Sequence, residues 1–170
     1  MRLACCVALA MMAALPAQAQ VQRCPDKLPA AVEARRAAIV KAATSRDWAA
    51  LERLIGPGEF VYSFGDAGDP IGYWRDSVKQ GTDIPRYLAA IFSMPCALSL
   101  EEDRPQYWWP AATEFEWKDL TAAEQAALDA LYDGKVDEWY IEGRATGYYV
   151  GWRGSIEKRN GAWSSFVAGD

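Results

Sequence analysis

The residues that most enzymes use for acid–base chemistry near neutral pH are missing from this 170-residue chain. It contains no histidine, which excludes Ser-His-Asp and Cys-His arrangements and histidine-based zinc sites. One pair, Ser155 and Lys158, has the S-x-x-K spacing of serine–lysine hydrolases. That chemistry requires the serine at the start of a helix and the lysine one turn later. Here both residues fall in a predicted strand and turn, where a spacing of three places them on opposite faces.

Carboxylates are the next candidates for catalysis or metal binding. Asp66 and Asp69 flank Gly68 in a short loop and offer oxygen ligands, but they lack the spacing of an EF-hand loop. An Asx turn that caps a helix starting near Pro70 is the simpler interpretation. The acidic run 101–103 offers paired carboxylates for glycoside hydrolysis, yet adjacent side chains diverge and charge runs usually face water. We therefore assign no catalytic residue, no metal and no cofactor, and keep Asp66 and Asp69 as weak metal candidates.

Aromatic residues are the largest group of candidate binding side chains. The chain has eight tryptophans and eight tyrosines, and rings beside polar loops can bind sugars, peptides or apolar ligands. Neighbours on a strand point to opposite faces, so one ring each of Trp108–Trp109 and Tyr148–Tyr149 must face another layer, a pocket or solvent. Packing in the core is the alternative for each ring. The candidate ligand or partner surface comprises Tyr62, Trp74, Trp108, Trp109, Tyr149 and Arg153.

The start of the chain has the pattern of a secretory signal peptide. Arg2 supplies a positive charge, residues 3–15 are apolar, and residues 17–19 form an A-x-A cleavage site. The apolar run is too short to span a bilayer. We expect cleavage near Ala19 to release a periplasmic or secreted protein, residues 20–170, without a membrane anchor.

Charge and cysteine usage agree with export. The formal net charge is −5 and the chain has no basic block, which argues against nucleic acid or an anionic membrane as a partner. Cleavage would remove two of the four cysteines and leave Cys24 and Cys96. An oxidising compartment favours a disulfide between them, with two separate buried thiols as the alternative.

Helices are predicted early in the chain and strands late. Apolar spacing and capping residues predict helices over residues 28–44, 48–55, 71–79, about 84–92 and about 122–131. Strands are predicted over residues 59–64, 96–100 and 106–109, with a brief strand or turn at 139–141.

The last stretch, residues 147–170, predicts a β-hairpin. Alternation over 148–157 places Val150, Trp152 and Ile156 on one face of a strand, with Tyr149 and Arg153 on the other. These alternating residues predict that the first face lies in the core.

The return strand has two possible facings, set by the turn at Asn160-Gly161. A two-residue loop places Trp163 and Val167 on the Trp152 face, and a three-residue loop with a glycine bulge places Phe166 there. We favour the bulge, because it gives one continuous apolar face.

Together these elements predict one α+β domain over residues 20–170, with N-terminal helices packed on an antiparallel sheet that ends in a C-terminal β-hairpin. A long helix, then RDWAALERLI (46–55) and EFVYSF (59–64), resembles the opening of NTF2-like and SnoaL-like domains, and GAWSSF (161–166) is similar to their last strand. The resemblance implies a curved sheet around a helix with a conical pocket. Helical segments between the strands depart from that family, and the His and Asp pairs of its catalytic members are absent.

The sequence therefore predicts an exported, soluble accessory or binding protein of the cell envelope that acts on an unidentified protein or small ligand. The alternatives are a small-ligand pocket protein of NTF2-like shape and a carboxylate- or metal-dependent hydrolase.

Overall fold

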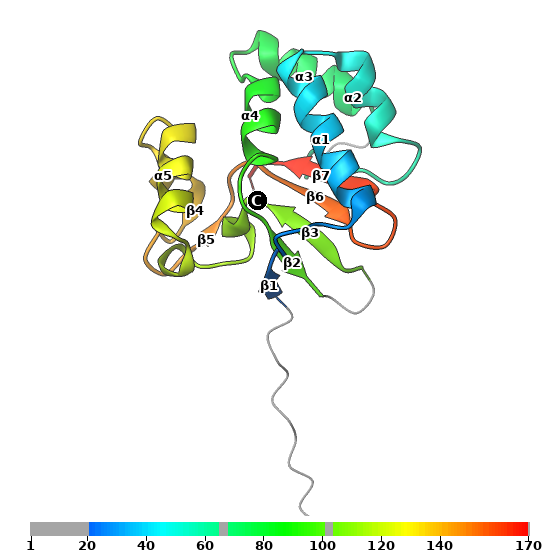
Figure 1. Ribbon diagram of the computed structural model, residues 1–170. Coiled ribbons are helices and arrows are strands. Elements are labelled where there is room, and N and C mark those ends of the chain that lie inside the picture. Colours follow the sequence, from blue (N-terminus) through cyan, green and yellow to red (C-terminus); the bar gives the residue numbers. More distant parts are fainter. Residues whose placement is uncertain (1–20, 65–67, 101–103, 170) are drawn as a thin grey trace, which may run out of the picture.

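The computed structural model describes residues 21–64, 68–100 and 104–169. The predicted signal peptide, Asp66 and the acidic run 101–103 lie outside these ranges. The described chain has the predicted α+β fold, with helices packed on an antiparallel sheet (Figure 1). Its α-helices are α1 (Ala30–Thr44), α2 (Trp48–Ile55), α3 (Pro70–Lys79), α4 (Ile84–Ile91) and α5 (Ala122–Leu131). Short 3₁₀ helices are η1 (Ala111–Thr113), η2 (Trp117–Asp119) and η3 (Val136–Trp139).

The main sheet has the strand order β1-β2-β3-β6-β7, and all neighbours are antiparallel. These strands are β1 (Val21–Arg23), β2 (Ala97–Ser99), β3 (Gln106–Trp109), β6 (Arg153–Glu157) and β7 (Trp163–Val167). A separate small sheet pairs β4 (Tyr140–Ile141) with β5 (Tyr148–Tyr149). In Figure 1, α4 lies between α5 and the α2–α3 pair. None of the helices described is long and apolar enough to cross a membrane.

The helix starts follow the capping residues read from the sequence. The side chain of Asp47 accepts the Ala50 N–H at 2.9 Å, and that of Asp69 accepts the Ile71 N–H at 3.0 Å. A capping box joins Thr121 to Glu124 at the start of α5. Each cap satisfies backbone donors that the first helical turn leaves unpaired. Asp69 is therefore a helix cap, as its simpler interpretation predicted.

The strand predicted over residues 59–64 is wrong. Only Val61 meets the sheet, through a parallel bridge in which its N–H donates to Ser164 O at 3.0 Å and its C=O accepts from Phe166 N–H at 2.9 Å. The neighbouring Phe60 turns into the core, with its ring 5.0 Å from that of Trp163. Packing of this ring competes with strand pairing, and a single bridge remains.

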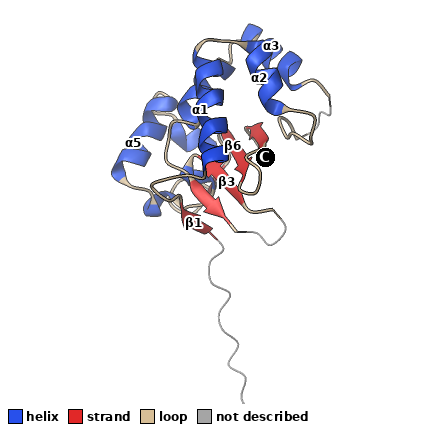
Figure 2. Cartoon of the chain, turned by 45° about the vertical axis from the view of Figure 1, so that its right-hand side comes forward, coloured by secondary structure: helices blue, strands red, loops and turns tan. Residues whose placement is uncertain are grey.

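Helix α1 lies across one face of the sheet, and the core fills the space between them (Figure 2). The rings of Phe92, Trp109, Trp163 and Phe166 are buried there and lie against one another. Gly154 permits this packing, because a Cβ at that position would stand 2.6 Å from the Phe92 ring. One contiguous cluster of buried residues extends from α1 to β7.

The hairpin differs from both predicted facings. Ile156 pairs with Trp163 and Gly154 pairs with Phe166, and the register shifts between Ser155 and Ile156. The bulge therefore lies in β7, opposite Ser155, and not at the turn. As a result Trp163 and Phe166 both reach the core, which neither a two-residue nor a three-residue loop allowed. A four-residue connection, 158–161, closes the turn, and the Glu157 N–H donates to Ala162 O at 2.9 Å.

The strand predicted over 148–157 is broken at residues 150–152. Tyr149 belongs to the small sheet and Arg153 to the main sheet, so the prediction that they share a face is wrong. Three hydrogen bonds form a closed ring at the break. Trp152 N–H donates to the Tyr132 oxygen at 2.9 Å, Tyr132 O–H donates to the Tyr149 oxygen at 2.6 Å, and Tyr149 O–H donates to Trp152 O at 2.9 Å. We call this ring of bonds the tyrosine clamp.

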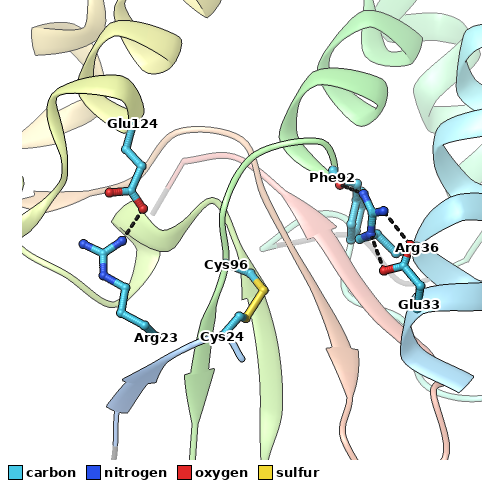
Figure 3. Close-up of a disulfide and its surroundings, with 7 residues drawn as sticks. All are labelled: Arg23, Cys24, Glu33, Arg36, Phe92, Cys96 and Glu124. Carbon is cyan, nitrogen blue, oxygen red and sulfur yellow. Dashed lines mark hydrogen bonds and ion pairs between the residues drawn. A yellow bond between two sulfur atoms is a disulfide. The ribbon is translucent and has the colours of Figure 1, made fainter. Parts of the chain in front are cut away.

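The disulfide between Cys24 and Cys96 is confirmed (Figure 3). It joins the end of β1 to the start of β2, and the Cys24 N–H donates to Cys96 O at 3.1 Å. Arg23, beside it, forms an ion pair with the buried Glu124 and donates to Asp119 O at 2.6 Å. These contacts fix the first strand both to the sheet and to the start of α5.

Candidate binding groove

A groove of about 1230 Å³ is lined by side chains of β3, β6 and β7, by Arg35 of α1 and by the segment that ends α2 and follows it. Strand alternation points Gln106 and Trp108 of β3 and Arg153, Ser155 and Glu157 of β6 toward this groove, because their neighbours fill the core. Residues 53–59, with Val61 and Phe64, also line the groove. We call it the sheet groove.

Three serine hydroxyl groups meet beneath the centre of the sheet groove, where Ser155 and Ser165 are buried and Ser164 is half-buried. The Ser155 hydroxyl lies 2.8 Å from that of Ser164 and 2.6 Å from that of Ser165. Ser164 also approaches the Gln106 side-chain oxygen at 3.2 Å. The bulge in β7 brings Ser164 and Ser165 together opposite Ser155, and a regular strand would place one of them on the core face.

Trp108 lies in this groove half-buried, beside Ser155 in the next strand. All eight tryptophans fall within the described residues. Six of them pair with another aromatic ring, and Trp48 lies under the Arg75 guanidinium. Among the contacts of the described chain, Trp108 is alone in having neither partner. Its indole is therefore available to a ligand.

Arginines dominate the charge of the sheet groove. The described charged residues that line it are the arginines Arg35, Arg53, Arg104, Arg153 and Arg159 and the glutamates Glu59 and Glu157. The whole chain has a formal net charge of −5, so the groove carries the opposite sign to the protein. A concave surface of one sign attracts ligands of the other.

The arginines differ in how firmly they are held. Arg35 donates to Gly161 O at 3.1 Å and also to Leu54 O, and Arg153 donates to Gly169 O at 2.9 Å. Arg53 and Arg159 are exposed, and neither forms an ion pair within the described part of the chain. Two exposed guanidinium groups therefore line the groove without an ion-pair partner among the described residues.

One end of the sheet groove is apolar. Val61 and Phe64 are 47% and 57% exposed, which is unusual for large apolar side chains in this molecule. The Arg153 guanidinium lies 5.5 Å from the centre of the Phe64 ring. Charge and apolar surface therefore meet at this end.

Two of the six predicted surface residues, Trp108 and Arg153, come together in the sheet groove. Trp109 and Trp74 are fully buried in the core, and Tyr149 is buried in the tyrosine clamp. Tyr62 is buried with its ring 5.4 Å from that of Tyr73. The expectation that one member of each aromatic pair faces outward is confirmed, since Trp108 faces the groove and Tyr148 is 57% exposed.

The serine–lysine pair does not form a nucleophile site. Ser155 is buried under the groove, whereas Lys158 is exposed in the turn and its backbone N–H donates to Pro105 O at 2.9 Å. Within residues 21–64, 68–100 and 104–169, no group of three or more His, Cys, Asp or Glu side chains is arranged to hold a metal ion.

A second cavity, of about 840 Å³, lies beside the disulfide. Its charged side chains are largely paired: Arg36 donates to Glu33 at 2.6 Å and to Phe92 O at 2.9 Å (Figure 3). The hydrogen bond from Arg36 lowers the pKa of Glu33. These groups already satisfy one another, so the sheet groove is the stronger candidate site.

Sequence reasoning missed the arginines at positions 35, 53, 104 and 159. They come from four separate segments, and no local spacing links them. The available signal was the alternation in β3 and β6, which places Trp108 beside Ser155 and leaves both opposite the core.

No protein-family model, curated protein or solved structure matches this chain. Function is therefore inferred from the geometry of the groove, and the resemblance to NTF2-like domains stays a prediction.

Proposed function

We propose that this protein is an exported binding or accessory protein of the cell envelope, and that its ligand or partner lies in the sheet groove. One observation carries the proposal: arginines gather on an open sheet face of an acidic chain. Arg35, Arg104 and Arg153 have partners within the fold, whereas Arg53 and Arg159 have no ion-pair partner among the described residues, so these two charges are open to an anionic ligand.

Export is supported by two features. The Cys24–Cys96 disulfide fits an oxidising compartment, where such bonds form and persist. The amino-terminal sequence has the charge, apolar run and cleavage site of a signal peptide.

A small-ligand pocket protein of NTF2-like shape is the second candidate, and the packing argues against it. A conical pocket would lie between the helix and the sheet. In this chain that space holds the buried rings of Phe92, Trp109, Trp163 and Phe166. The larger open volume, the sheet groove, is lined mainly by side chains of the sheet that point away from this core.

Photo-crosslinking in the native cell envelope tests the proposal. A benzophenone-bearing residue replaces Val61 in the groove, and in a control variant it replaces Tyr148, a somewhat more exposed position that does not line the groove. We expect an adduct that depends on the probe at position 61. Absence of an adduct there, or equal adducts from both positions, would contradict the proposal.

A further inference from the structure

We infer that the sheet groove binds an anionic polysaccharide, a chain of carboxylate-bearing sugar rings. This inference rests on the proposed function and names the chemical class of its ligand. Three features of the groove lead to it: the spread of the arginines, the indole of Trp108, and the polar side chains of Ser164 and Gln106.

The spread of positive charge fits a repeating anion. Arg153 lies at one end of β6 and Arg159 lies in the turn beyond the other end. Residues 153 and 157 alone are separated by about 13 Å along the strand. A single carboxylate cannot reach both ends, whereas a chain with an acid group on each ring can. Guanidinium groups bind carboxylates in a bidentate manner, which favours arginine at such positions.

Size points the same way. The groove volume, about 1230 Å³, exceeds the range typical of a pocket for one drug-sized molecule. The groove is also lined along its length by residues of β3, β6 and β7, so it suits an extended ligand.

The floor suits sugar rings. Trp108 offers an indole that no other ring or cation covers in the described structure. Beside it, the half-buried Ser164 and Gln106 present a hydroxyl and an amide group, and the buried Ser155 supports Ser164 from below. A sugar ring has an apolar face that packs on an indole, and hydroxyl groups at its edge that exchange hydrogen bonds with serine and glutamine.

An acidic polypeptide fits less well. Extended peptides commonly bind by adding a strand to a sheet edge. The groove offers side chains on a sheet face, and at the β7 edge the backbone of Val61 already bonds to Ser164 and Phe166. A polyglutamate chain also has no sugar ring that could pack on the Trp108 indole, and no hydroxyl groups for the polar side chains of the groove floor.

The test measures fluorescence anisotropy of labelled polygalacturonate with the purified chain, near physiological ionic strength of about 0.15 M. A neutral glucan and polyglutamate serve as comparison probes. We expect polygalacturonate to bind, the neutral glucan not to bind, and polyglutamate to bind at least tenfold more weakly. Affinity should fall as salt rises, because exposed ion pairs are screened.

Two variants test the assigned groups. The double variant Arg53→Gln/Arg159→Gln should weaken binding about tenfold, from two exposed charge pairs. Trp108→Thr, which removes the indole and introduces a residue of high strand propensity, should weaken it by a similar factor. The matched double variant Lys41→Gln/Lys135→Gln removes the same charge outside the groove and should leave affinity unchanged. Thermal unfolding of each variant confirms that it is folded.

Each contrary result overturns the inference. These results are no binding of polygalacturonate, equal binding of polyglutamate, no effect of either groove variant, or an equal loss in the lysine variant. If polygalacturonate does not bind but the photo-crosslinked adduct at position 61 still forms, only the proposed ligand class is refuted. Loss of both would refute the proposed function as well.

Discussion

Removal of one hydroxyl group from the tyrosine clamp should destabilise the protein measurably. In Tyr132→Phe, Trp152 N–H loses its acceptor and Tyr149 loses one of its two hydrogen-bond partners. Both groups are buried, so water cannot replace the lost bonds. A buried donor left without an acceptor costs about 1–3 kcal/mol.

Tyr140, which packs beside the tyrosine clamp, provides a control variant that is not expected to lower the free energy of unfolding. The Tyr140 hydroxyl is buried and has no hydrogen-bond partner in the described structure, and its ring lies 5.5 Å from that of Tyr149. Tyr140→Phe removes an unsatisfied polar group and leaves the packing. We expect it to leave the free energy of unfolding unchanged or to raise it, since a buried polar group without a partner is costly.

Urea unfolding followed by tryptophan fluorescence provides the measurement. The midpoint for Tyr132→Phe should fall at constant m-value, which indicates a change in stability and not in the unfolded state. In a chain of this length a loss of 1 kcal/mol lowers the thermal midpoint by about 2–4 °C. Equal destabilisation by Tyr132→Phe and Tyr140→Phe would refute the reasoning, because ring packing and not hydrogen bonding would then account for both.

Three further changes test other contacts. Gly151→Ala should lower the free energy of unfolding by about 1–3 kcal/mol, measured by thermal unfolding, because the added Cβ would overlap the hydroxyl of Tyr132. Wild-type stability of this variant would contradict the prediction, since the side chains around Gly151 would then accommodate the Cβ. The mature chain, residues 20–170, should take up no thiol-alkylating label when it is denatured without reduction, and labelling before reduction would contradict the disulfide. Replacing both Cys24 and Cys96 by serine should lower the free energy of unfolding by roughly 4 kcal/mol, because the unfolded chain is then no longer closed into a loop. Burial alone would raise the pKa of Glu124, but hydrogen bonds from neighbouring groups hold it below its ordinary value. The stability that the ionised Glu124 side chain contributes is therefore present above its unfolded-state pKa of about 4.3 and is lost as pH falls below that value. Glu124→Gln should lower the free energy of unfolding by about 1–2 kcal/mol at pH 7, and by progressively less toward pH 3, in urea titrations. A difference in stability that stays constant with pH would contradict this assignment.

Local rules predicted much of the fold. Capping residues such as Asp47, Asp69 and Thr121 define helix starts through bonds within a few residues, so the helices begin close to their predicted positions. The Cys24–Cys96 pair followed from cysteine count and the expected compartment. Errors arose where distant packing decides the backbone. Phe60 leaves its strand to pack against Trp163, and no local pattern reveals that contact.

The candidate site was predicted only in part. Alternation required one of Trp108 and Trp109 to face away from the core and placed Arg153 on the face opposite Trp152, and both expectations depend on strand geometry alone. The prediction for Tyr149 failed because a side-chain network, and not a turn signal, breaks the strand before Arg153. The rim residues Arg53 and Arg159 come from separate segments, and only the tertiary fold brings them to one groove.

The tyrosine clamp also lies at the boundary between two regions that we expect to differ in mobility, the main sheet and the part of the chain that contains α5, β4 and β5. The β4–β5 sheet shares no hydrogen-bonded strand with the main sheet. Side chains such as Tyr132 and Glu124 instead connect α5 and its neighbours to the rest. Few backbone hydrogen bonds, such as that from Gly169 N–H to Val150 O, add to these contacts, and regions joined in this way can open as cooperative units while the main sheet stays folded. Amide hydrogens of α5 should therefore exchange with deuterium faster than those of β3 and β6. Tyr132→Phe should increase this difference in exchange rate.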